Sequence, residues 1–133
     1  MLAAGPGRWD VHVSGSLTTT QKPSGRRFNQ IVEFNPVEPT QVIGDLAKSW
    51  ELSQDGNSYT FKLHDVTWSD GVPLTAADIV FSLDRMVTPG KKMGKVAALR
   101  SYYAHQTATA IDDSTVNVPM IFPVGSFLDW LAA

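Results

Sequence analysis

The stretch "WSDGVPLTAADIVFSLDRM", residues 68–86, combines a tight turn, a proline and the start of a helix. Thr75 is placed to cap that helix, and Asp78 follows three residues later, where it completes a capping box near the positive end of the helix dipole. Leu74, just before the cap, is expected to pack onto Ile79. An apolar stripe follows at helical spacing: Ala76, Ile79, Val80, Leu83, Met86 and Val87. The stretch therefore predicts an amphipathic helix that buries one face.

A hairpin is expected just before this helix. Residues 50–63 alternate apolar and polar side chains on both sides of Asp55 and Gly56, a pair that is typical of tight turns. Such alternation predicts that one face of the hairpin packs in the core and the other is exposed to solvent. The apolar positions are Trp50, Leu52, Tyr59, Phe61 and Leu63.

A second hairpin is predicted within residues 105–120, with its turn at residues 112–114. Pro119, which has no backbone N–H, suggests that this strand lies at an edge of the sheet. The side chains expected on one face are Val116, Val118 and Met120. Aspartates at turns are expected to bond local backbone through their carboxylates; they are Asp55, Asp65, Asp70 and Asp113.

The remaining segments are predicted to be short or extended. Residues 96–103 can form one or two helical turns, and residues 126–133 a short amphipathic helix. That last helix is expected to present Phe127, Leu128 and Leu131. Residues 1–27, rich in Gly, Ser, Thr and Pro, are expected to form a flexible or extended arm. Residues 28–133 are predicted to be one α+β domain, a small antiparallel or mixed sheet of hairpins with one main helix.

Composition excludes several classes of protein. Eleven basic and thirteen acidic residues give a net charge of −2, which argues against a nucleic-acid partner. The absence of cysteine excludes a disulfide scaffold, a thiol nucleophile and the usual structural zinc sites. No segment approaches the ~20 apolar residues of a membrane span, and the first ten residues lack a basic leader. Any export signal is therefore expected to lie outside this chain.

No residue pattern predicts catalysis, a metal or a cofactor. The histidines, His12, His64 and His105, form neither an HxxxH nor an HxH pattern. The "SGS" at residues 14–16 is not a GxSxG elbow, and no segment matches a phosphate-binding loop. No spacing brings two carboxylates to one cleft for acid–base work. A small hydrolase is therefore only a minor hypothesis.

The four tryptophans offer rings that could stack on a ligand. Trp50 lies in an alternating strand and Trp130 in the last helix, so both are expected in the core. Trp9 and Trp68 are less constrained by any pattern, and for them both a core and a ligand role stay open.

Three consecutive segments carry a family resemblance: "GDLAKSWELSQDGNSYTFKL", "HDVTWSDG" and "VPLTAADIVFSLDRM", residues 44–86. They resemble the phrases "DLAESWE", "DGLTYTF", "DGVKFHDG" and "PLTAEDVVFSLER" of the oligopeptide- and dipeptide-binding proteins, the peptide/nickel class of extracellular solute-binding proteins of ABC importers. Looser similarity continues through residues 26–39, 101–120 and 122–133. His64 stands where the family usually has Arg, and one Gly of the following turn is missing.

The resemblance implies a fragment of the first lobe of a periplasmic-binding-protein-like fold, because family members are several times longer and hold solute between two lobes. It implies a protein located in the periplasm or outside the cell, associated with the membrane, that captures peptides or similar small solutes and delivers them to an ABC permease. In the family that this chain resembles, the groups that fix the charged ends of a peptide come largely from the later lobe. The fragment alone is therefore expected to bind no ligand tightly.

The resemblance also points to a ligand-facing segment. In relatives the equivalent N-terminal stretch borders the cleft and can pair with extended peptide backbone. The residues so implied, in the intact protein, are Val13, Ser14, Gly15 and Ser16. The alternative to the transport reading is a stand-alone interaction module that binds a partner through the Phe127 to Leu131 segment.

Overall fold

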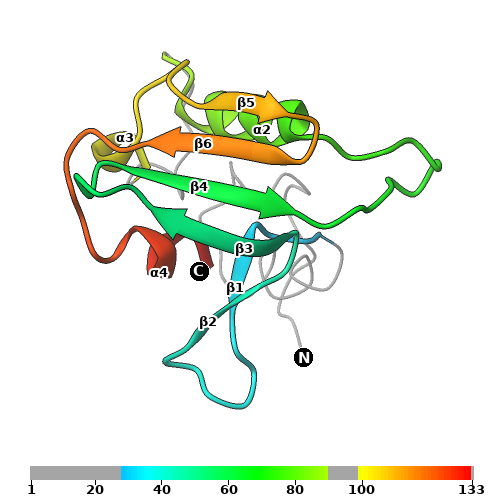
Figure 1. The fold of residues 1–133 in the computed structure, drawn as a ribbon, viewed down its shortest axis with the longest axis horizontal. Coiled ribbons are helices and arrows are strands. Elements are labelled where there is room, and N and C mark those ends of the chain that lie inside the picture. The colour runs from blue at the N-terminus through cyan, green and yellow to red at the C-terminus, as the bar shows by residue number, and fades with distance from the viewer. Residues whose placement is uncertain (1–27, 90–98, 133) are drawn as a thin grey trace, which may run out of the picture.

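The computed structural model describes residues 28–89 and 99–132. A two-stranded pair joins β1 (Val32–Phe34) to β2 (Val42–Gly44). A four-stranded antiparallel sheet contains β3 (Ala47–Leu52), β4 (Ser58–Leu63), β5 (Thr109–Asp112) and β6 (Thr115–Pro119). The described helices are α2 (Ala76–Val87), α3 (Leu99–Tyr102) and α4 (Phe127–Ala132), as Figure 1 shows. The predicted α+β class is confirmed.

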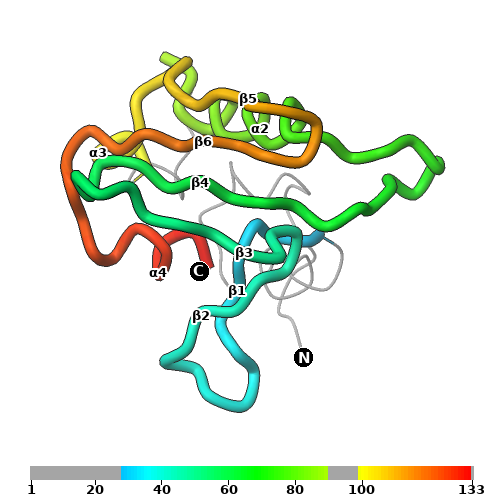
Figure 2. Tube along the Cα trace, viewed as in Figure 1, coloured from blue at the N-terminus to red at the C-terminus, as the bar shows by residue number. Residues whose placement is uncertain are grey.

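The larger sheet has the strand order β3-β4-β6-β5, so the two predicted hairpins meet at the pair of β4 and β6. The register aligns Trp50 with Phe61 and Phe61 with Val116, which puts these side chains on one face. Thr60 and Asn117 are paired on the opposite face and share a hydrogen bond of 3.2 Å. In Figures 1 and 2 the helix α2 lies behind the sheet. The predicted core face and wet face are therefore confirmed.

Helix α2 begins as the sequence predicts. The Thr75 backbone N–H donates to the Asp78 carboxylate at 2.8 Å, and the Thr75 hydroxyl donates to the same oxygen at 3.2 Å. Leu74 packs against the core cluster that contains Ile79. The stripe is confirmed: Ala76, Ile79, Leu83 and Val87 are buried, and Val80 and Met86 are half-buried against them. The helix ends at Val87, with Thr88 as its C-cap.

The turn that precedes α2 closes despite its missing residue. The Trp68 N–H donates to the Val72 carbonyl at 2.8 Å, and the Gly71 N–H donates back to the Trp68 carbonyl at 2.9 Å. Gly71 has φ of 87°, a conformation that costs a glycine little because it has no Cβ. Asp70 stabilises the turn by accepting from the Val72 N–H at 3.0 Å. A short antiparallel bridge between Thr67 and Pro73 completes this arm.

Pro119 does not mark an edge strand, so this prediction is wrong. β6 lies between β4 and β5. The pairing with β5 ends at Asn117, two residues before Pro119. On the other side, the Met120 N–H donates to the Asn57 carbonyl at 2.7 Å, so the neighbouring Pro119 nitrogen faces the side that β5 has already left. β6 can contain a proline here because Pro119 pairs only with β4, so no hydrogen bond to β5 requires its missing N–H.

Leu52 is a second exception, because its side chain is exposed although its strand alternates. It is the last residue of β3, the edge strand that lies farthest from β5 in the sheet. The tryptophans predicted in the core, Trp50 and Trp130, are half-buried and pack against it. Trp68 is exposed in the described arm, and Trp9 lies outside the described residues.

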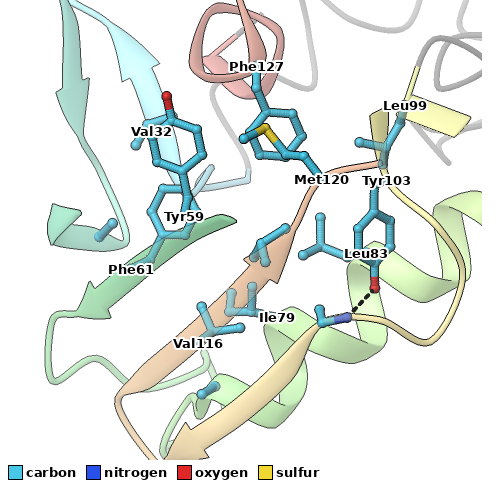
Figure 3. Close-up of a cluster of buried hydrophobic side chains, with 14 of the residues drawn as sticks. Val32, Tyr59, Phe61, Ile79, Leu83, Leu99, Tyr103, Val116, Met120 and Phe127 are labelled. Carbon is cyan, nitrogen blue, oxygen red and sulfur yellow. Dashed lines mark hydrogen bonds between the residues drawn. The ribbon is translucent and has the colours of Figure 1, made fainter. Parts of the chain in front are cut away.

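The core joins both hairpins to all three described helices, as Figure 3 shows. The ring of Phe127 stacks on Tyr59 with centroids 5.8 Å apart, and Tyr59 stacks on Phe61 at 5.9 Å. Phe127 is completely buried, whereas Leu128 and Leu131 are half-buried. The helix α4 is thus a part of the core and does not expose Phe127 for a partner.

Candidate functional site

The residues that the sequence analysis places at the ligand, Val13, Ser14, Gly15 and Ser16, lie outside the described residues, as does His12. Their role in the intact protein stays a prediction. Among the described residues, the groups available for chemistry are the polar and titratable side chains.

The turn aspartates follow the predicted pattern in part. Asp55 accepts from the Asn57 backbone N–H at 3.1 Å, and Asp70 bonds the turn before α2. In the last hairpin the prediction named the wrong residue, because Asp112, not Asp113, accepts from the Ser114 N–H at 2.8 Å. The Asp113 backbone carbonyl instead accepts from the Ala76 N–H at the start of α2. Asp65 makes no side-chain hydrogen bond within the described ranges.

These bonds favour the charged carboxylates. The Ser53 hydroxyl, with the Asn57 backbone and side chain, lowers the pKa of Asp55 below its ordinary value. The Ser114 backbone N–H, followed by the Thr115 side chain, lowers the pKa of Asp112. Both carboxylates are exposed and serve their own turns. This is the behaviour of turn residues and not of a catalytic acid, whose pKa would be raised.

No metal centre or membrane helix is present in the part of the chain that the structure describes. No group of three or more His, Asp and Glu side chains there could hold a metal ion. His64 is exposed and His105 is half-buried, on separate elements. No helix in residues 28–89 and 99–132 is long and apolar enough to cross a membrane.

Within residues 28–89 and 99–132, a partly buried polar cluster joins α2 to the segment that enters β5. The Tyr103 hydroxyl donates to Asp84 at 2.6 Å. It also accepts from the Ala108 backbone N–H at 3.1 Å, the hydrogen bond that is dashed in Figure 3. Asp84 also accepts from the Gln106 N–H at 2.8 Å, and Gln106 has φ of 63°. No local sequence pattern predicts this cluster, because Asp84 and Tyr103 are 19 residues apart and Asp84 lies off the apolar stripe. The cluster fixes the packing of α2 against β5.

Replacing Tyr103 by phenylalanine is expected to lower the free energy of unfolding by about 1–3 kcal/mol, because the buried Ala108 N–H then has no acceptor. Urea unfolding followed by tryptophan fluorescence measures the change. Tyr102→Phe is the matched control, since the half-buried Tyr102 has no hydroxyl hydrogen bond among the described residues. Equal effects of the two substitutions would contradict this role of the Tyr103 hydroxyl.

Tyr103 also predicts a pH dependence of stability. Burial, followed by the hydrogen bond to Asp84, raises the pKa of Tyr103 to about 12. The unfolded chain ionises this phenol near pH ~10, so between about pH 10 and pH 12 the unfolded state loses a proton that the folded state keeps. The stability that Tyr103 contributes is complete below this window and falls as the pH rises through it. Urea midpoints from pH 8 to pH 12 are expected to fall more steeply for the wild type than for Tyr103→Phe; parallel curves would contradict the assignment.

Comparison with known proteins identifies the family. Residues 41–133 match the bacterial extracellular solute-binding proteins, family 5 Middle. The chain is 34% identical over 132 residues to the dipeptide-binding protein of Escherichia coli, a match that covers 88% of this chain and 24% of that protein. The chain therefore spans about a quarter of the length of this relative.

Solved structures agree with this match. A periplasmic oligopeptide-binding protein from Borrelia burgdorferi is 26% identical with a TM-score of 0.85, over 97% of this chain and 28% of that one. NikZ from Campylobacter jejuni, solved in complex with Ni(L-His), is 30% identical with a TM-score of 0.68, over 79% of this chain and 20% of that one. The fold and the sequence therefore lead to one assignment. The chain belongs to the bacterial extracellular solute-binding proteins, family 5.

Proposed function

We propose that this chain is part of the solute-binding component of an ABC transporter, which captures peptides or similar small solutes outside the membrane for import. The observation that carries the proposal is the family match over residues 41–133. The identity to a dipeptide-binding protein supports peptides as the solute class. NikZ was solved in complex with Ni(L-His), so metal chelates are the second class of solute to test.

Within that protein the described residues act as a structural subdomain. Their polar groups are used in turns, in the helix cap and in the Tyr103 cluster, and the buried side chains form one core. We infer that the chain catalyses no reaction and that Val13, Ser14, Gly15 and Ser16 border the solute cleft of the intact protein. The partner is an ABC permease, and the location is the periplasm or the cell exterior, at the membrane.

Native mass spectrometry of the parent protein, offered a mixed pool of dipeptides, oligopeptides and nickel–histidine complexes, tests the proposal. The parent protein is expected to retain one solute from the pool, and the 133-residue chain is expected to retain none. A tight, stoichiometric solute on the 133-residue chain alone would overturn the assignment of this chain to a structural role. Failure of the parent protein to retain any member of the pool would count against the solute class.

A further inference from the structure

Two turns of this chain contain an aspartate followed by a glycine, Asp55–Gly56 and Asp70–Gly71. The first closes the hairpin of β3 and β4. The second lies in the arm before α2, residues 64–74, which projects beyond the end of the sheet in Figure 1. Because glycine has no Cβ, its backbone nitrogen is less shielded than that of any other residue. The nitrogen of each glycine can therefore attack the carboxyl group of the preceding aspartate.

The two turns share one local geometry. Asp55 accepts from the Asn57 backbone N–H at 3.1 Å. Asp70 accepts in the same way from the Val72 backbone N–H at 3.0 Å, so each carboxyl closes a ring that contains the nitrogen of the following glycine. Each glycine N–H donates to the carbonyl three residues earlier at 2.9 Å, and the two glycines have φ of 71° and 87°. A difference in reactivity between the turns therefore depends on what surrounds them.

The hairpin turn holds its carboxylate with two further hydrogen bonds. The Ser53 hydroxyl donates to one oxygen of Asp55, and the Asn57 side-chain amide donates to the other at 3.2 Å. The Ser53 hydroxyl, followed by the Asn57 backbone N–H, also lowers the pKa of Asp55, so less of this carboxyl is protonated at mildly acidic pH. The Met120 N–H donates to the Asn57 carbonyl at 2.7 Å, which fastens the turn to the end of β6. Asp55 must give up these bonds before it can react.

The turn in the arm constrains its aspartate less. Among the described residues, the Asp70 side chain accepts a hydrogen bond from the Val72 N–H alone. A Cβ added at Gly71 would have no heavy atom within 4 Å, whereas one added at Gly56 would lie 3.6 Å from the Pro123 side chain. A five-membered ring can therefore form at the arm turn without displacing a packed group.

We propose that Asp70–Gly71 is a site of spontaneous isomerisation to isoaspartate, and that the extra hydrogen bonds to Asp55 protect Asp55–Gly56 from the same reaction. The Gly71 nitrogen bonds to the side-chain carboxyl carbon of Asp70, and a carbon–oxygen bond of the protonated carboxyl breaks. The hydroxyl leaves with the amide proton as water, and a succinimide remains. Water then opens the ring: attack at the main-chain carbonyl gives isoaspartate, and attack at the other carbonyl restores aspartate. One water is released and one is consumed, so the mass is unchanged, and isoaspartate lengthens the main chain of the arm by one carbon.

Ageing of the 133-residue chain at mildly acidic pH and body temperature tests the proposal. Tryptic cleavage puts the two sites in separate peptides, because Lys62 lies between them. Electron-transfer fragmentation then distinguishes isoaspartate from aspartate of equal mass. Isoaspartate is expected to accumulate several-fold faster at Asp70 than at Asp55. Equal accumulation at the two sites, or faster accumulation at Asp55, would overturn the proposal.

Two controls separate the effect of the folded turns from that of the local sequence. In concentrated urea the turns lose their hydrogen bonds, so the rates at the two sites are expected to converge. In the folded chain, Asn57→Ala removes a side-chain donor to Asp55 and is expected to speed isomerisation there several-fold, with no change at Asp70. Val72→Ala, at the equivalent position of the arm turn, is expected to change neither rate.

A rate ratio in urea equal to that of the folded chain would assign the difference to sequence and overturn the proposal. An Asn57→Ala variant that isomerises at Asp55 as slowly as the wild type would do the same. The reaction requires no solute, so its outcome is independent of the proposed function.

Discussion

Replacing Phe127 by alanine is expected to lower the free energy of unfolding by about 3–5 kcal/mol, the cost of deleting a buried aromatic side chain. Phe127 is 0% exposed and stacks on Tyr59. It also fastens α4 to the face of the sheet that carries α2 (Figure 3). Small domains are stable by only about 5–15 kcal/mol, so this change removes a large share of the total. Urea unfolding, with far-UV circular dichroism as a second probe, measures it.

Phe81→Ala is the matched control for this substitution. Phe81 lies in α2 but keeps 68% of its surface exposed, so its loss is expected to change the free energy of unfolding by only about 0.5 kcal/mol. The contrast between two phenylalanines separates core packing from a general effect of removing a ring. If Phe127→Ala were as mild as Phe81→Ala, the placement of α4 in the core would be wrong.

Replacing Gly44 by alanine is expected to destabilise the chain by about 3 kcal/mol, at the upper end of the cost of overpacking. A Cβ added at Gly44 would lie 1.9 Å from the Ala47 carbonyl oxygen. That oxygen belongs to the backbone where β3 begins, so it cannot move aside as a flexible side chain would. The substitution must therefore shift the connection between β2 and β3.

Gly125→Ala supplies the control, because no heavy atom lies within 4 Å of a Cβ added there. Its free energy of unfolding is expected to stay within about 0.5 kcal/mol of the wild type. Thermal unfolding of the two variants, checked by urea unfolding, gives the comparison. A Gly44→Ala variant as stable as Gly125→Ala would show that the connection has room that the structure does not provide.

The local elements could be predicted from the sequence because their signals are local. The capping residues Thr75 and Asp78 and the apolar stripe of α2 lie within a few residues of one another, and the structure confirms them. The alternation in β4 and β6 likewise predicted which side chains are buried. Propensity and periodicity are sufficient to predict a structure that depends only on residues close in sequence.

The incorrect or missing predictions concern residues whose environment depends on segments far away in the sequence. The lack of a backbone N–H at Pro119 predicts an edge strand. The sequence does not show that β5 stops pairing with β6 at Asn117, two residues before the proline, which is why Pro119 fits in an inner strand. The partner of Asp84 was missed because Tyr103 reaches it only after the chain has passed through α3. The exposure of Leu52 depends on the position of β3 at the edge of the sheet, which no pattern within the strand encodes.

The candidate ligand site was predicted only through the family resemblance, and the structure does not describe Val13, Ser14, Gly15 and Ser16. No local chemical signal marks them, because backbone pairing with an extended peptide requires no special side chain. The family itself was predictable from the ordered phrases of residues 44–86, which the match over residues 41–133 confirms. These phrases encode a turn, a helix cap and a helix, so they identify the fold.

The central claim is that this chain supplies a structural subdomain to a solute-binding protein whose remaining parts hold the solute. The test is isothermal titration of a dipeptide into a chimera, in which this chain replaces the matching segment of the E. coli dipeptide-binding protein. The folded chimera is expected to bind the dipeptide at one site, and the isolated 133-residue chain is expected to show no binding heat. A folded chimera that binds no dipeptide, or an isolated chain that binds it at one site, would rule out this role of the chain.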